Sequence, residues 1–274
     1  MNRPKAKRLY LHALTPLHSG VGQAAEIIDL PIAREKATGW PVIPGSSLKG
    51  VLRSEHEDAR AKALYGSQEA PGPVSFSDLR ILCLPVRSFY GTFAWVSSPL
   101  ALQRCLRDGG ALGARPPFDA VPEPPESESA LTSGSALCRD GHVYLEDLNV
   151  AAKQDPKTAE IAVSMGKEIF GDPASTFIQR FCIVTDAVFD FLSETATEVS
   201  ARIAMGEDGT TSGKGGNLWY EEAVPAEAIF YGWAVETGHG NAEEVWTDLQ
   251  GKSILQLGGS ASVGRGLCRL VVAE

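Results

Sequence analysis

The chain has 274 residues, of which 43% are hydrophobic and 22% are charged, proportions that fit a globular protein with a sizeable core. Its longest apolar runs, 81–86 and 267–273, are far too short to span a bilayer, so the sequence predicts no membrane association. The net charge of −9 at first disfavours a nucleic-acid partner.

The expected elements alternate between strands and helices. Residue alternation and turn residues predict strands at 8–14, 27–32 (a short extended piece, since Pro31 excludes a helix interior), 74–87 (one or two strands), from 92 (a strand end), 181–188, 229–235 and 267–272. Helices are predicted at 46–64, 157–170, 173–177 and 241–249. A further helix is predicted to follow the strand end at 92 and to run to 107. Ser46 or Ser47 is expected to cap the first helix, which should stop near Gly66. Because these elements interleave with hairpins, the predicted fold class is α+β.

Two segments interrupt this alternation. Residues 202–205 and 217–221 predict two strands joined by a long glycine-rich tip at 206–216. Residues 108–135 are rich in proline and acidic residues and predict a mobile acidic insertion rather than a packed element. The sequence shows no internal repeat, so we expect one domain over 1–274 that carries both features.

The N-terminal residues and the cysteines bear on the compartment. Residues 1–5 lack the apolar stretch of a secretion signal, so we expect a cytoplasmic protein. The cysteines are scattered without a Cys-x-x-Cys pair, which argues against a disulfide framework and a structural zinc site. We expect each of them to be a small buried side chain: Cys83, Cys105, Cys138, Cys182 and Cys268.

The charges are unevenly distributed. Residues 1–53 contain eight Lys/Arg and three Asp/Glu, a net charge of +5, whereas the rest of the chain has a net charge of −14. Phosphate binding depends on the local field, so a basic N-terminal face on an acidic body is compatible with RNA. Solvated surface charge without a partner is the alternative interpretation.

Two glycine-rich patterns resemble nucleotide-binding motifs but fail in context. Residues 20–25 fit the Gly-x-Gly-x-x-Ala spacing, but Pro31 arrives before the helix that must hold a pyrophosphate could form. The segment before Lys214 lacks the first glycine of a P-loop, and Gly215 stands where Ser or Thr should bind magnesium.

The segment Pro44-Gly45-Ser46-Ser47-Leu48-Lys49-Gly50 is more informative. Its turn would deliver two hydroxyls and free backbone N–H groups to a helix N-terminus, where the helix dipole attracts anions. Lys49 in the first turn is mildly unfavourable by itself, which favours a phosphate partner over an ordinary capped helix.

The C-terminal segment 258–266 contains four glycines and Arg265. The glycines would let a backbone approach closely, and Arg265 could hold a phosphate by two hydrogen bonds. A glycine-rich turn with one solvated arginine is the equal alternative. The presence of both this segment and the Ser46–Lys49 helix start on one chain favours binding of a polyphosphate backbone.

His18 and Asp29 flank the loop after the first strand. Two isoleucines precede Asp29 and Leu30-Pro31 follow it, an unusual place for a solvated charge. Asp29 could bond its own backbone in a turn, or it could bind a divalent ion or orient a 2′-hydroxyl for attack on its neighbouring phosphate. His18 could support proton transfer, although a lone histidine is more often structural.

These segments together resemble the RAMP superfamily of CRISPR RNA-binding proteins, and within it the repeating backbone subunit of type III-B (Cmr) complexes. The resemblance spans nearly the whole chain and is carried by 14–20, 28–35 (Ile-Asp-Leu-Pro-Ile-Ala-Arg-Glu), 38–53, 85–88, 217–222 (Asn-Leu-Trp-Tyr-Glu-Glu), 257–259 and 264–266.

The resemblance implies an RRM-like, ferredoxin-type palm, an antiparallel sheet with helices, with inserted fingers and a β-hairpin thumb at about 201–220. It implies a helical filament of several copies along the CRISPR RNA, other Cmr subunits as partners, and thumbs that disrupt the guide–target duplex at regular intervals. Residues implied along the RNA are Arg34, Ser46, Ser47, Lys49, Arg53, Lys214, Trp219, Gly258, Gly259 and Arg265.

The resemblance also implies the chemistry. Asp29 occupies the position of the aspartate that, with Mg²⁺ or another divalent metal, cuts the complementary target RNA beside each thumb, and His18 would lie near the cleavage site. Family members without cleavage exist. A non-catalytic guide-RNA scaffold is therefore one alternative, and a stand-alone RAMP nuclease that processes CRISPR repeats is another. The sequence does not place the 108–135 insertion in this scheme.

Overall fold

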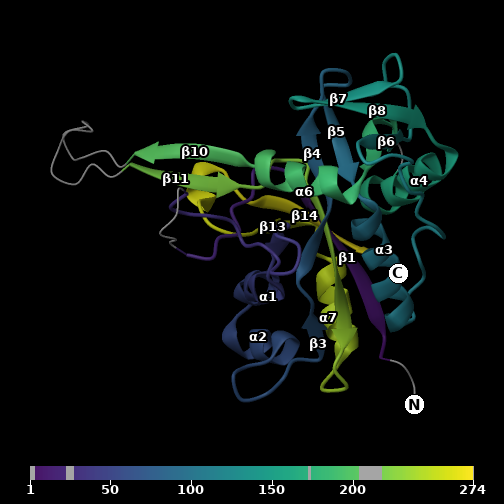
Figure 1. The fold of residues 1–274 in the computed structure, drawn as a ribbon. Helices are drawn as coiled ribbons and strands as arrows, with labels where there is room; N and C mark the ends of the chain where they lie inside the picture. The colour runs from purple at the N-terminus through teal and green to yellow at the C-terminus, as the bar shows by residue number, and fades with distance from the viewer. Residues whose placement is uncertain (1–3, 23–27, 172–173, 204–217, 274) are drawn as a thin grey trace.

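The computed structural model describes residues 4–22, 28–171, 174–203 and 218–273. Figure 1 shows a body built around one large sheet, from which a two-stranded hairpin projects to the left. None of the described helices is long and apolar enough to cross a membrane. Four of the five cysteines are buried and Cys138 is half-buried, which confirms the expected packing role for the four.

Four central strands form the palm. β1 (Ala6–Ala13), β4 (Leu79–Arg87), β12 (Ile229–Glu236) and β14 (Leu267–Ala273) lie in the order β14-β1-β12-β4, and all neighbours are antiparallel. Helices α1 (Gly45–Ser54) and α2 (Asp58–Tyr65) connect β1 to β4, and α7 (Ala242–Gln250) connects β12 to β14. This βαββαβ order confirms the predicted ferredoxin-type palm.

Short strands at the rim complete the palm. β2 (Val42–Ile43) pairs with β4, β3 (Val74–Phe76) with β12, and β13 (Ile254–Gln256) with β14. A single 3-10 turn, η1 (Ala261–Val263), precedes the last strand.

The sheet continues beyond β4 into the inserted fingers. In spatial order the further strands are β5 (Phe93–Ser97), β9 (Phe181–Val184), β6 (Ser129–Thr132), β8 (Leu148–Gln154) and β7 (His142–Leu145). β5 pairs with β9, and β6 with β8, in parallel. The antiparallel sheet predicted for the palm is therefore confirmed, and the inserted fingers add two parallel pairs.

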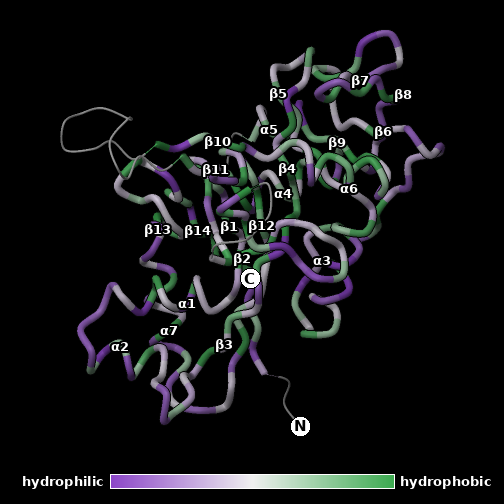
Figure 2. Tube along the Cα trace, turned by 60° about the vertical axis from the view of Figure 1, so that its left-hand side comes forward, coloured by the Kyte–Doolittle hydropathy of each residue, from purple (hydrophilic) through white to green (hydrophobic). Residues whose placement is uncertain are grey.

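Successive side chains of β1 point to opposite faces of the sheet and pack into two hydrophobic cores, one on each face. Leu9 and Leu11 join a cluster with residues of α1, α2, α7 and α6 (Asp186–Thr195), whereas Tyr10 joins a cluster with residues of α3 (Pro99–Leu112), α4 (Pro156–Phe170) and α5 (Ser175–Arg180). Figure 2 shows hydrophobic residues concentrated along the central strands and hydrophilic stretches on α2.

The first helix differs from its prediction. It begins at Gly45, and its N-cap residue, Pro44, provides no side-chain cap. The single helix predicted here is interrupted between α1 and α2. His56 in this break bonds to Asp248 of α7 at 3.0 Å, and its ring stacks on Tyr65 of α2. The break therefore lets both helices pack on α7. Helix α2 ends before Gly66, as predicted.

The segment 108–135 contains packed elements, so the prediction of an unpacked insertion is wrong. Its start is the end of α3, its end is strand β6 between β9 and β8, and Phe118 between them is buried in the second core. One aromatic anchor and strand pairing outweigh the proline-rich composition.

The predicted strand 181–188 also ends early, because Thr185 caps α6 by accepting from the Val188 N–H.

The projecting hairpin is the predicted thumb. β10 (Glu198–Ile203) and β11 (Leu218–Ala223) form a separate antiparallel pair, with a register that runs from Glu198↔Ala223 to Ile203↔Leu218. The glycine-rich tip and Lys214 lie outside the described residues.

Candidate nucleic-acid interface

Segments far apart in the sequence meet at the base of the thumb. Isolated bridges join Leu17 to Val224, Gly20 to Ile32, and Leu30 to Glu221. The C-terminal loop adds a third layer, because the Gly259 N–H donates to the His18 carbonyl at 2.9 Å. The loop after β1, the segment 28–34, β11 and the C-terminal loop therefore form one site.

Asp29 is fixed against the thumb. Its Oδ2 accepts a hydrogen bond from the Tyr220 N–H at 2.8 Å, and the Leu30 N–H donates to the Tyr220 carbonyl at 3.0 Å. Asp29 thus bonds a strand distant in sequence, in addition to any role in its own turn. The side chain is half-buried, and Oδ2 is the oxygen bonded to the thumb. This arrangement gives a carboxylate of fixed position at the edge of the thumb.

His18 lies behind this segment and is 8% exposed. Its Nδ1 lies 2.6 Å from the Glu222 carbonyl, and because a carbonyl oxygen only accepts, Nδ1–H donates. In the neutral ring Nε2 is then the acceptor. The Nε2 edge faces Gly20, where a Cβ atom would lie 2.5 Å from it. The ring orientation and tautomer are therefore set by the thumb backbone.

Glu222, which is buried, and Arg34, which is half-buried, form an ion pair beneath the thumb. Arg34 Nη2 donates to Glu222 Oε1 at 2.5 Å, and Arg34 Nη1 donates to the carbonyls of Gly39 and Ser193. Arg34 was expected along the RNA. In the structure its guanidinium instead joins the thumb to the body.

Arg265 is also an internal partner. It is 9% exposed, its Nε forms an ion pair with Glu221 Oε1 at 3.1 Å, and its Nη2 donates to Ser200 at 3.0 Å. Burial disfavours the charged form of Glu221, but the hydrogen bond from Ser260 and the charges of Arg202 and Arg265 outweigh it and hold the pKa of Glu221 below its usual value. The guanidinium expected to hold an RNA phosphate thus holds the thumb.

Glycines of the C-terminal loop allow a close approach within the chain. Gly258 has a φ of +76°, and a Cβ there would overlap the His18 carbonyl. Gly266 has a φ of +79°, and a Cβ there would overlap the Leu257 carbonyl. The glycine pattern was interpreted as backbone approach to a ligand. The structure shows that it packs the loop against the segment after β1.

The start of α1 exposes part of the predicted phosphate site. Ser46 is exposed, Ser47 and Lys49 are half-buried, and no described carboxylate pairs with Lys49. The Gly45 N–H donates to Asp78 Oδ1 at 2.9 Å, so one helix-terminal donor is already used. Arg53, one turn on, lies 3.6 Å from Asp58. Lys49 is therefore the cation of this group that is left for a phosphate.

The two faces of the thumb differ in polarity. The face that carries Ser200, Arg202 and Glu221 is bonded to the C-terminal loop. The opposite face is apolar and exposed, at Val199, Ile203, Leu218 and Tyr220. Trp219 is half-buried and pairs in register with Arg202.

The residues near Asp29 fit a metal ion only in part. Among the described residues there is no group of three or more His, Cys, Asp or Glu that could hold a metal. Mg²⁺ is commonly held by one or two carboxylates together with substrate phosphates. Asp29 and RNA phosphates fit that pattern, whereas a site built from protein ligands alone does not.

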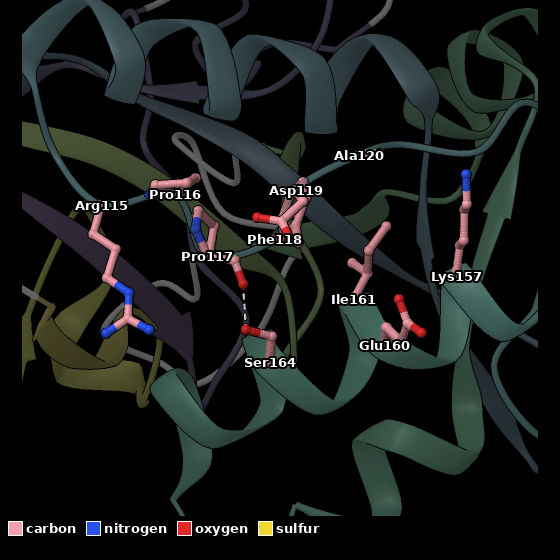
Figure 3. Close-up of a pocket in the computed structure, with 10 residues that line it drawn as sticks. All are labelled: Arg115, Pro116, Pro117, Phe118, Asp119, Ala120, Lys157, Glu160, Ile161 and Ser164. Atoms are coloured by element: carbon pink, nitrogen blue, oxygen red, sulfur yellow. Dashed lines mark hydrogen bonds between the residues drawn. The ribbon is translucent and has the colours of Figure 1, made fainter.

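The cavity shown in Figure 3 lies elsewhere, between residues 115–120 and α4. It encloses about 490 Å³, and Ser164 donates to the Pro117 carbonyl at its wall. Arg115 and Lys157 point outward at opposite ends, and none of the candidate residues lines it. It is not part of the interface.

Sequence reasoning missed Asp78, Glu221 and Glu222. The two adjacent glutamates of Leu-Trp-Tyr-Glu-Glu are each 3% exposed. Consecutive carboxylates on a strand next to aromatic residues were the available signal for buried ion pairs, since an unpaired charge is rarely buried.

Comparison with known proteins gives a consistent answer. A family model described as the RAMP superfamily matches residues 10–269. The chain is 35% identical to the CRISPR system Cmr endoribonuclease Cmr4 of Pyrococcus furiosus over an alignment 289 positions long, which covers 98% of this chain and 96% of the relative.

Solved structures share the fold. The crystal structure of oligomeric Cmr4 from Pyrococcus furiosus superposes with a TM-score of 0.78 at 32% identity, covering 98% of each chain. A chain in the cryo-EM structure of the type III-B Cmr-beta complex bound to cognate target RNA has the same fold, with a TM-score of 0.76 at 20% identity over 98% of this chain and 97% of that one. The chain belongs to the RAMP superfamily.

Proposed function

We propose that this chain is a backbone subunit of a type III-B CRISPR effector complex, which binds CRISPR RNA and cleaves complementary target RNA. The observation that carries the proposal is the attachment of the Asp29 carboxylate to the base of the thumb through the Tyr220 N–H at 2.8 Å. Support comes from a relative named as an endoribonuclease and from a structural neighbour bound to cognate target RNA.

The partners follow from the same comparison. A neighbour described as oligomeric supports further copies of this chain as partners, and complexes of type III-B support other Cmr subunits. Guide RNA would run past the start of α1, where Ser46 and Ser47 offer hydroxyls and Lys49 offers a charge that pairs with no carboxylate of the described residues. The apolar face of the thumb would then meet bases rather than phosphates.

Cleavage in this proposal is mainly a positioning effect. The thumb splays one target nucleotide so that its 2′-oxygen, the phosphorus on its 3′ side and the 5′-oxygen of the next nucleotide align. The carboxylate of Asp29, with Oδ2 bonded to the thumb, takes the 2′-hydroxyl proton or holds a metal ion. The 2′-oxygen bonds to phosphorus as the bond to the 5′-oxygen breaks, which leaves a 2′,3′-cyclic phosphate, and the 5′-oxygen leaves as a hydroxyl after it takes a proton from water. Mg²⁺ at Asp29 would neutralise charge on the phosphoryl oxygens.

His18 has a secondary part in this scheme. Its Nδ1–H is committed to the Glu222 carbonyl, so only Nε2 could exchange a proton. Because the ring is 8% exposed and enclosed by glycines, we propose that it supports the position of the Asp29 segment and supplies Nε2 for proton transfer only after RNA binds.

The function is tested with reconstituted complexes that contain guide RNA and divalent ions. Wild-type complexes should cut complementary RNA at regular intervals and leave 5′-hydroxyl ends, whereas Asp29→Ala complexes should bind the same RNA and leave it intact. Equal cutting by both complexes would contradict the role of Asp29. Absence of cutting by wild-type complexes would support the scaffold alternative, and cleavage of repeat RNA by the isolated chain in EDTA would support a processing nuclease.

A further inference from the structure

The carboxylate of Glu222 is a junction beneath the thumb. Besides Arg34 Nη2 at 2.5 Å, it accepts hydrogen bonds from Thr197 Oγ1 at 2.9 Å and from the Ile32 N–H at 3.1 Å. The side chain is 3% exposed, so these bonds are shielded from water. One carboxylate thus satisfies three donors from two segments, Ile32 and Arg34 of the segment 28–34 and Thr197 before β10.

Each donor belongs to a part of the molecule that must be correctly placed for cleavage. Ile32 lies in the short segment that carries Asp29, and Thr197 immediately precedes β10 of the thumb. Arg34 continues to the Ser193 carbonyl at 3.1 Å, and therefore to the end of α6. The bonds to Glu222 thus connect the Asp29 segment, both thumb strands and the helix from which the thumb departs.

The backbone of the same residue completes the connection. The Glu222 N–H donates to the Leu30 carbonyl at 3.0 Å, and its carbonyl accepts from His18 Nδ1 at 2.6 Å. The Asp29 side chain is held by the Tyr220 N–H and the His18 side chain by the Glu222 carbonyl, so both candidate catalytic side chains are held by backbone groups of β11 within two residues of Glu222. A rotation of the thumb cannot leave the Asp29 segment behind while these bonds persist.

We propose that Glu222 is a positioning residue for target-RNA cleavage, which couples the position of the thumb to the position of Asp29. This inference rests on the proposed function of Asp29. Misplacement of a reacting group by about 1 Å costs on the order of 10²-fold in rate, so small shifts of the segment are sufficient. The ionised carboxylate is required because an amide offers one acceptor oxygen and would turn its NH₂ group toward the Arg34 guanidinium or the Ile32 N–H.

The experiment uses assembled complexes with guide RNA and compares Glu222→Gln with Glu168→Gln. Glu168 is the control because its carboxylate also accepts from an arginine and a hydroxyl, Arg8 Nη1 at 2.8 Å and Tyr10 at 2.9 Å, but it lies in α4, on the other face of the sheet. Single-turnover cleavage is measured with saturating complementary RNA, and target affinity is measured separately. Glu222→Gln should slow cleavage by about 10- to 100-fold with affinity changed less than about twofold, whereas Glu168→Gln should keep the wild-type rate.

A milder variant keeps the test valid if Glu222→Gln fails to assemble. Thr197→Val removes only one bond to Glu222 and leaves the ion pair intact, so it should slow cleavage by about three- to tenfold without loss of assembly. In an Asp29→Asn background the second substitution should have no further effect, because a positioning residue acts through Asp29. A purely structural residue would lower any residual activity again.

Three outcomes would overturn the inference. These are a wild-type rate for Glu222→Gln or, where that variant does not assemble, for Thr197→Val; an equal slowing by Glu168→Gln; and additive losses with Asp29→Asn. If Asp29→Ala itself cuts normally, the proposed function fails instead. If Asp29 is essential and the Glu222 variant cuts normally, only the coupling proposed for Glu222 fails.

Discussion

Asp29 and Tyr220 lie 191 positions apart in the sequence, yet the Tyr220 N–H donates to Asp29 Oδ2 at 2.8 Å. Tyr220 also presents its side chain on the exposed apolar face of the thumb, at 42% exposure. The residue that would contact a displaced base therefore also fixes the carboxylate proposed to cut beside it. Tyr220 of strand β11 therefore links disruption of the guide–target duplex to cleavage of the target RNA.

Lys49 is predicted to contribute to RNA affinity through its charge. Lys49→Gln should weaken binding of guide RNA and lower the salt dependence of log K by about one unit of slope, because one phosphate contact is lost. The measurement is RNA affinity as a function of salt concentration. Lys62→Gln is the control, since Lys62 already pairs with Asp58 at 2.7 Å. An identical salt slope for wild type and Lys49→Gln would contradict the predicted contact.

Gly258 is predicted to be intolerant of a side chain. Gly258→Ala should lower the free energy of unfolding by about 1–3 kcal/mol, because φ is +76° and the new Cβ would overlap the His18 carbonyl. Gly110→Ala in α3 is the matched control, since a Cβ there meets nothing within 4 Å. It should raise stability by about 0.5–1 kcal/mol. Urea unfolding measures both, and equal stabilities would contradict the close approach.

The elements of the palm could be predicted from the sequence, because their alternation and turn residues are local signals. β1, β12 and β14 lie within one or two residues of the predicted strands. The fingers were harder, since β6 and β7 are four-residue strands whose existence depends on partners far along the chain. The burial of Phe118 could not be predicted either, because it too depends on residues far along the chain.

The candidate site was predictable in its parts but not in its pairings. The sequence identified Asp29, His18 and the glycine-rich loop, and the structure brings them together at the thumb base. It did not reveal that Arg34 and Arg265 have internal partners, because Glu222 and Glu221 lie 188 and 44 positions away from them. A single arginine carries no local sign of whether its partner is a phosphate or a carboxylate.

Glu35 is predicted to make stability depend on pH. Hydrogen bonds from Arg104, opposed by partial burial, lower the pKa of Glu35 from 4.5 to about 2. A lowered pKa means that the stabilisation is fully present above pH 4.5 and is lost as the pH falls toward 2. Glu35→Gln should therefore cost about 1–2 kcal/mol at neutral pH, after allowance for solvent screening, and progressively less in acid.

Urea unfolding of wild type and Glu35→Gln across this pH range is the measurement. Glu69→Gln serves as the control because Glu69 is exposed and forms no ion pair with a described residue. Glu35 pairs with Arg104 and also with Arg80, whose Nε lies 3.2 Å from Glu35 Oε1. A difference in stability between wild type and Glu35→Gln that stays constant with pH would show that these ion pairs do not account for the stabilisation.

The substitution Asp29→Asn tests most directly whether the negatively charged carboxylate of Asp29 is required for cleavage of the target RNA. Asparagine keeps an oxygen that can accept from the Tyr220 N–H, so the thumb should stay in place while the charge is removed. The measurement is the single-turnover cleavage rate of complementary RNA by assembled complexes, with target affinity determined in parallel. We predict a loss of at least about 10²-fold in rate with unchanged affinity. A rate equal to that of the wild type at matched binding would contradict the account.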